Sequence, residues 1–154
     1  FGRANASLEA GKTFGEVPLG LLNVVPGNQT YFAMYNSFPV LNFYEFVTDT
    51  YVSAHFDHNF NGRLFARIPF LRELNLRELV GARAVWGEIS EENKALNASG
   101  IPLRAPSKAP YYEYSVGVGN ILKFLSIEAH FRGNYFDVPE SRSFAVTASF
   151  GFHF

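Results

Sequence analysis

Apolar and polar residues alternate with a period of two along most of the chain, most regularly in residues 143–154. The residues on one side of this alternation are small or polar. Those on the other side are apolar throughout: Phe144, Val146, Ala148, Phe150, Phe152 and Phe154. Because successive side chains of a strand point to opposite faces, this pattern predicts a β-strand with one apolar face.

The same alternation appears in five earlier segments, residues 2–11, 46–61, 75–87, 112–119 and 125–135. It is weakest in the first, and Glu78 interrupts the apolar face of the third. The sequence therefore predicts an all-β fold of about six strands. A hairpin around Pro26-Gly27-Asn28 would raise the number to eight, but Pro18 and Pro26 fit poorly in central strands, so we expect six.

The connections between these strands alternate in length. Residues 13–44 and 90–110 form long links, whereas the links around residues 68–73 and 119–123 are short. Outer-membrane barrels have short periplasmic turns and long outer loops. This pattern predicts an antiparallel up-and-down transmembrane β-barrel with outer loops at residues 13–44 and 90–110 and the C-terminus in the periplasm.

A soluble β-barrel or sandwich would also alternate, so residue types must decide. The polar faces favour Ser, Thr, Gly, His and Asn, which suit a lumen. Aromatic residues number 26 of 154, and charged residues are 18%, against roughly 25% in soluble domains. No window approaches the roughly 20 apolar residues that a membrane helix needs. We therefore expect strands in a bacterial outer membrane, in contact with lipid and lipopolysaccharide.

The last five residues, Phe-Gly-Phe-His-Phe, resemble the C-terminal signal by which outer-membrane barrels are recognised by the barrel-assembly machinery. The resemblance assigns an assembly signal to Phe150, Phe152 and Phe154.

A wider resemblance covers nearly the whole chain, and its most specific pieces are Glu45-Phe-Val-Thr-Asp49, Asn61-Gly62 and Ile68-Pro69. These resemble a family of large outer-membrane proteins of Bacteroidetes that have an N-terminal carboxypeptidase-regulatory-like domain and a C-terminal barrel of uncharacterised function. That barrel is distantly similar to BamA-type barrels. The Arg-Gly-aromatic loop motif of that group is absent here, which argues against a translocase role.

The chain begins at Phe1 without an initiator Met, and the resemblance implies the tail of a longer protein. Six strands are also fewer than the 8 of the smallest closed single-chain barrels. We therefore expect residues 1–154 to be the C-terminal part of a larger barrel, completed by strands of the parent chain or a larger outer-membrane complex.

Charged and imidazole side chains on the polar faces are expected to form a lumen network: Asp49, His55, Asp57, Arg77, Arg83, Glu113, Glu128, His130 and Arg132. A metal site at His55, Asp57 and His58 is disfavoured, because His58 points away from the other two in a strand. No nucleophile, phosphate-loop or zinc motif is found. We expect no cofactor and no enzymatic activity, and the net charge of −1 gives no basis for nucleic-acid binding.

The function expected is that of a non-catalytic outer-membrane barrel in transport, assembly or surface anchoring. Two alternatives stay open: a soluble lipocalin-like barrel that binds a small ligand, and an outer-membrane barrel enzyme.

Overall fold

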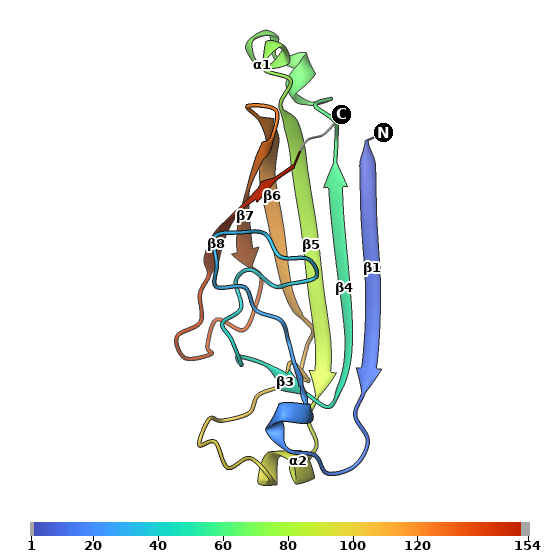
Figure 1. Ribbon diagram of the computed structural model, residues 1–154, viewed down its shortest axis with the longest axis vertical. Coiled ribbons are helices and arrows are strands. Elements are labelled where there is room, and N and C mark those ends of the chain that lie inside the picture. The colour runs from blue at the N-terminus through green and yellow to red at the C-terminus, as the bar shows by residue number, and fades with distance from the viewer. Residues whose placement is uncertain (1, 152–154) are drawn as a thin grey trace.

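A computed structural model describes residues 2–151 and shows one large antiparallel sheet (Figure 1). The sheet has six strands, namely β1 (Arg3–Lys12), β4 (Thr50–Asn59), β5 (Arg77–Glu88), β6 (Tyr111–Ile121), β7 (Leu125–Arg132) and β8 (Phe144–Phe150). The predicted strands of the sheet are thereby confirmed to within a few residues at most ends, because period-two alternation is the main signal that a strand leaves in a sequence.

The six strands follow one another across the sheet in the order β1-β4-β5-β6-β7-β8, each antiparallel to its neighbour. The pairing of β4 with β5 is regular over ten residues, from Thr50 opposite Glu88 to Asn59 opposite Leu79. Within residues 2–151 β1 and β8 do not pair with each other. The structure is thus an open up-and-down sheet with two edges.

The long segment between β1 and β4, residues 13–49, folds back onto one face of the sheet (Figure 1). It contains the short 3-10 helix η1 (Leu19–Leu21) and the paired strands β2 (Asn23–Val24) and β3 (Val47–Thr48). We call residues 13–49 the inserted segment. Most of the buried apolar side chains belong to it, including Val25, Phe38, Leu41, Phe46 and Val47.

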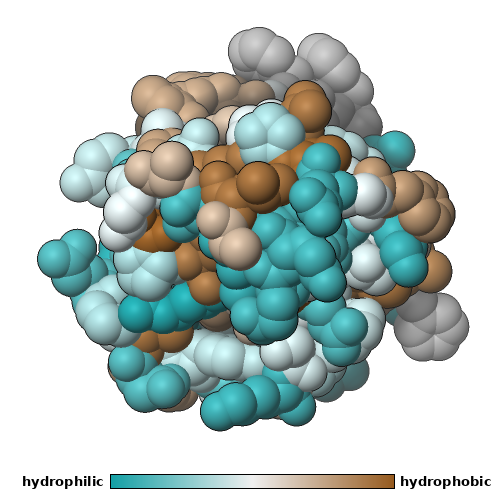
Figure 2. All heavy atoms as spheres, turned by 90° about the horizontal axis from the view of Figure 1, so that it is seen from below, coloured by the Kyte–Doolittle hydropathy of each residue, from teal (hydrophilic) through white to brown (hydrophobic). Residues whose placement is uncertain are grey.

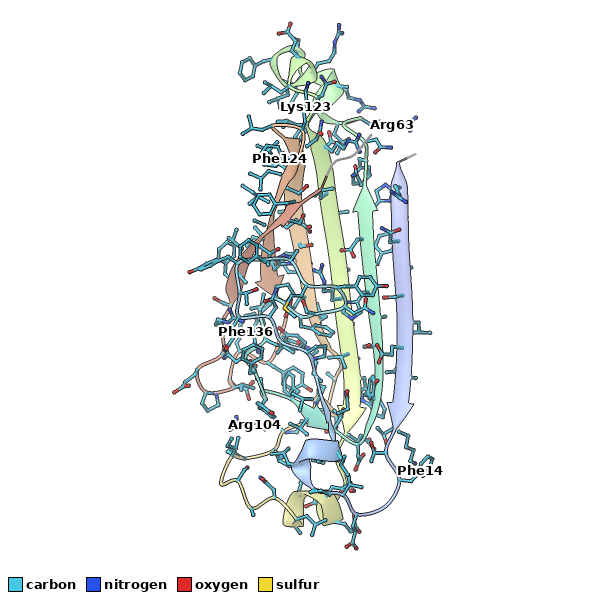
Figure 3. All side chains as sticks on the ribbon, viewed as in Figure 1. Phe14, Arg63, Arg104, Lys123, Phe124 and Phe136 are labelled. Carbon is cyan, nitrogen blue, oxygen red and sulfur yellow. The ribbon has the colours of Figure 1, made fainter. Side chains whose placement is uncertain are left out.

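The connections lie at two opposite ends of the sheet. One end carries the link between β4 and β5, with η2 (Phe65–Arg67) and α1 (Pro69–Glu73), and the tight β6–β7 turn beside Lys123 (Figure 3). The other carries α2 (Glu91–Ala95) and the long link that follows it. Seen from below, this second end is largely teal and white with patches of brown (Figure 2).

The link between β4 and β5 differs from the short turn predicted around residues 68–73. Pro69 occupies the first position of α1, where a proline without an N–H is best tolerated. The 3-10 helix η2 precedes it, so the link contains two short helices. No helix in the described part of the chain is long and apolar enough to cross a membrane.

The sheet is covered on its polar face and exposed on its apolar face, the reverse of a sheet in a soluble protein. An ordinary half-exposed sheet buries its apolar face and wets the polar one. Across β4 to β8, large apolar side chains remain exposed on one face: Val52, Phe56, Tyr112, Tyr114, Val116, Ile127, Phe144, Val146 and Phe150. The alternate side chains, under the inserted segment, are polar and buried: Ser53, His55, Glu113, Ser115, Ser126, His130, Arg132 and Thr147.

Candidate functional site

The buried polar face of β4 to β8, together with the inserted segment that covers it, is the candidate functional site. Alternation within the strands places its side chains: the odd residues of β6 and the even residues of β7 point to the same side. Opposite charges on neighbouring strands are therefore brought level by the register, as in Arg83 opposite Glu113 and Glu113 opposite Arg132.

Arg132 connects the sheet to the inserted segment through a buried ion pair. Its Nη2 lies 2.5 Å from Oε1 of Glu45, and the two side chains are 0% and 3% exposed. Its Nε and Nη1 donate to the backbone oxygens of Arg142 and Tyr135 at 2.7 and 2.9 Å. The guanidinium also lies over the ring of Tyr111, 5.0 Å from its centroid. Bonds to several partners of this kind are what allow a buried charge to be tolerated.

Glu113 makes a second connection to the inserted segment. Its Oε1 accepts hydrogen bonds from the Tyr111 hydroxyl at 2.7 Å and from the backbone N–H of Val40 at 3.1 Å. Tyr111 is fully buried against Phe38 and Phe46. The carboxylate thus satisfies a backbone donor of the inserted segment that would otherwise be buried without a partner.

A chain of polar contacts crosses the sheet beside these two anchors. Asp57 pairs with Arg83 at 3.2 Å, Arg83 lies 3.1 Å from Nδ1 of His130, and Nε2 of His130 lies 2.8 Å from the Thr147 hydroxyl. Gly81 leaves room for this chain, because a Cβ there would lie 2.4 Å from Ser115 Oγ and 2.8 Å from Asp57 Oδ1. The contacts tie four strands together through side chains.

Asp49 lies just outside β4 and holds the start of α2. Its Oδ2 accepts hydrogen bonds from the Ser90 backbone N–H at 2.7 Å and from Asn93 Nδ2 at 3.1 Å. Burial opposes the charge, but the hydrogen bonds from Ser90 and Asn93 outweigh it and lower the pKa of the carboxyl. Asn93 in turn accepts the backbone N–H of Val17, so this cluster fixes both the inserted segment and α2.

The other predicted network residues lie on the same face but make fewer polar contacts. His55 packs its ring on Phe38, with centroids 5.0 Å apart, and Glu128 accepts from the Ser115 hydroxyl at 3.3 Å. Arg77 lines a polar cavity of about 440 Å³ that it shares with Arg83, His55, Asp57 and Glu128. All nine predicted residues therefore lie on or beside the buried polar side of the sheet, although they form several small clusters.

Two groups important to this site were not predicted from the sequence. Arg142 donates from Nη2 to the backbone oxygens of Asn28, Pro39 and Leu41 at 3.1, 3.1 and 2.7 Å. Glu45 pairs with Arg132 as described above. Period-two alternation cannot find either of them, because both lie outside the strands. The one sequence signal for Glu45 is that it belongs to the most specific piece of the family resemblance.

The terminal aromatic residues stand apart from this site. Phe150 ends β8 on the exposed apolar face, with its ring 6.2 Å from that of Phe124. Phe152 and Phe154, the other two residues of the predicted assembly signal, lie outside the described residues.

The arrangement acts as a set of anchors, with most of its polar groups bound to the backbone or to each other. Among residues 2–151 no three His, Cys, Asp or Glu side chains gather as a metal site.

Comparison with known proteins gives one match. Residues 2–94 match the family model described as "Family of unknown function (DUF5686) C-terminal domain". The chain belongs to this family. The matched region runs from β1 to α2 and contains the whole inserted segment with Glu45 and Asp49, whereas Glu113, His130 and Arg132 follow it. No curated protein and no solved structure matches the chain.

Proposed function

We propose that this DUF5686 C-terminal domain forms part of a transmembrane β-barrel in a bacterial outer membrane. The observation that carries the proposal is the reversed covering of the sheet: across β4 to β8 the exposed face is apolar and the polar face is buried under the inserted segment. A lipid-facing barrel wall requires this arrangement. A soluble small-ligand barrel would require the apolar side chains to point inward, so the same observation argues against the lipocalin-like alternative.

The exposed apolar face also has the dimensions and the aromatic content of a barrel wall. Most of its strands are 10 to 12 residues long, against about 9–11 for a tilted membrane strand. Aromatic rings lie next to one another across it. The ring centroids of Tyr114 and Phe131 are 5.3 Å apart, and so are those of Phe131 and Phe144. Such an array would contact acyl chains and, at its ends, headgroups.

The two edges of the sheet, along which no full strand pairs within residues 2–151, support a larger barrel. An unpaired strand edge costs several kcal/mol per backbone group in hydrocarbon, and closed single-chain barrels begin at 8 strands. We infer that further strands, from the parent chain or a larger complex, pair with β1 and β8. The barrel-assembly machinery is the expected partner during biogenesis.

The inserted segment indicates what this barrel would do. Its apolar core and its anchors to Glu113 and Arg132 fill part of the space over the polar face. A filled interior favours a non-catalytic domain that anchors or assembles other parts at the membrane over a permanently open pore.

Arginine substitutions test which face meets lipid. Val116 lies at the centre of β6 and is exposed on the apolar face, whereas Ser149 lines the polar cavity. In full-length protein folded into bilayers, Val116→Arg should lower the free energy of unfolding by about 2–4 kcal/mol, the effect of a cationic residue at the bilayer midplane. Ser149→Arg, the matched control, should be milder. Equal effects, or a harmless Val116→Arg, would contradict the proposal.

A further inference from the structure

The outer edge of β8 is held at one point by the inserted segment. The backbone N–H of Ala33 donates to the oxygen of Ala148 at 2.9 Å, and the N–H of Ala148 donates to the oxygen of Tyr31 at 2.7 Å. These two bonds form a parallel bridge between Phe32 and Ala148. The Phe32 ring lies 6.3 Å from that of Phe150, further along the same strand. Residues 31–33 therefore occupy the edge like a very short additional strand.

Side-chain hydrogen bonds shape the segment for this contact. Asn28 is 1% exposed and donates from Nδ2 to the oxygen of Phe32 at 2.7 Å. Its Oδ1 accepts from the N–H and the hydroxyl of Thr30 at 2.9 and 2.7 Å. Arg142, in the connection that leads into β8, donates to the oxygen of Asn28. Residues 28–33 are thus tied both to themselves and to the approach to β8.

The direction of this pairing conflicts with a closed barrel. Residues 31–33 run parallel to β8, whereas the strands of outer-membrane barrels are antiparallel. An antiparallel strand at this edge would need the N–H of Ala148, which already donates to Tyr31. Because one N–H supplies one donor, the two pairings exclude each other.

The contact between residues 31–33 and β8 can also be replaced by pairing with another strand. Tyr31 and Phe32 are 81% and 61% exposed, so releasing them uncovers little apolar surface. Two backbone hydrogen bonds would be lost, and an incoming strand would replace them and add more along β8. In hydrocarbon that gain is large, because the unpaired groups of an edge have no water to bind.

We propose that residues 31–33 are a latch that covers the edge of β8 until an antiparallel barrel strand pairs there, and that the latch leaves this edge when the barrel closes. The occupant is an extended segment that pairs through its backbone and carries apolar side chains on the same face as Val146 and Ala148. The latch rests on the proposed barrel, because only a closed barrel requires the edge of β8.

A disulfide that locks the latch tests it. Bridged residues lie about 4.8 Å apart, within the range of about 4.4–6.8 Å that a disulfide spans between Cα atoms. The test protein is the full-length chain with Phe32→Cys and Ala148→Cys, and the control pair is Ala54→Cys with Ala84→Cys, register partners on β4 and β5. Each is refolded into bilayers, oxidised or reduced, and closed barrel is scored by its heat-dependent electrophoretic mobility.

The latch predicts at least a tenfold loss of closed barrel in the oxidised latch pair, reversed by dithiothreitol, and normal closure of the control pair in both states. Closure of the oxidised latch pair at the reduced level would overturn it. Ala33→Pro, which removes the donor to Ala148, should close at least as fast as wild type, and slower closure would also count against the latch. A wild-type protein that never enters the bilayer would contradict the barrel itself, and the latch with it.

Discussion

Arg132 lies where β7, the inserted segment and the β7–β8 connection meet. Its Nη2 pairs with Glu45, its Nη1 donates to the backbone oxygen of Tyr135, and its Nε donates to the backbone oxygen of Arg142. A buried cation stabilises a structure only when its partners are all present, since the cost of leaving water is several kcal/mol per ion. At the residue scale, therefore, this side chain is one of the main connections between the inserted segment and the sheet.

Removing one member of the ion pair tests that role. Arg132→Met keeps an unbranched apolar stem but leaves Glu45 buried without its cation, so we expect a loss of about 3–5 kcal/mol in the free energy of unfolding. Glu45→Gln combined with Arg132→Met should cost less than the sum of the two single changes. Urea unfolding of the protein in bilayers measures both, and additive effects would contradict the direct coupling of the two groups.

The sequence could predict which residues share the polar face, but not what they bind. Alternation assigns Arg132 and Glu113 to that face from their place in the strands alone. Their partners Glu45 and Val40 lie 87 and 73 residues away in a segment without strand periodicity. No local pattern reports such contacts, because they depend on how the inserted segment folds back.

At the element scale, the strands were predictable and the connections less so. Each strand of the sheet carries its own period-two signal, which is independent of tertiary context. The link between β4 and β5 was expected to be a short turn, but it contains η2 and α1. The Phe65 N–H in this link donates to one carboxylate oxygen of Glu78, on the apolar side of β5. Helices of three and five residues are too short to leave a periodic signal.

The two ends of the sheet make a prediction about topology. Three strands, β6, β7 and β8, separate α2 and its following link from the C-terminal end of β8, and because this number is odd the two lie at opposite ends of the sheet. If the C-terminus lies in the periplasm, as we propose, an epitope tag inserted at Ala98 should be detected on intact cells. A tag near Arg67, between β4 and β5, should be detected only after the outer membrane is breached. The opposite result would invert the orientation.

At the scale of the whole molecule, the central feature is a sheet whose polar side is its interior. The inserted segment packs Phe38 and Phe46 on Tyr111 of β6 in an apolar core, but leaves the far face of the sheet uncovered. Contiguous apolar side chains exposed across several strands are typical of an interaction surface. We propose that this surface faces lipid.

The accessibility of β6 side chains to oxygen and to a water-soluble reagent tests directly whether the apolar face meets lipid. The chain has no cysteine of its own, so single cysteines at residues 112–118 of the full-length protein in bilayers can carry a nitroxide, with any cysteine elsewhere replaced. Collision with oxygen, which concentrates in lipid, should be high at Tyr112, Tyr114 and Val116 and low at Glu113 and Ser115. If the first three positions instead collided mainly with a water-soluble nickel chelate, the apolar face would be facing water and the account of a membrane barrel would be wrong.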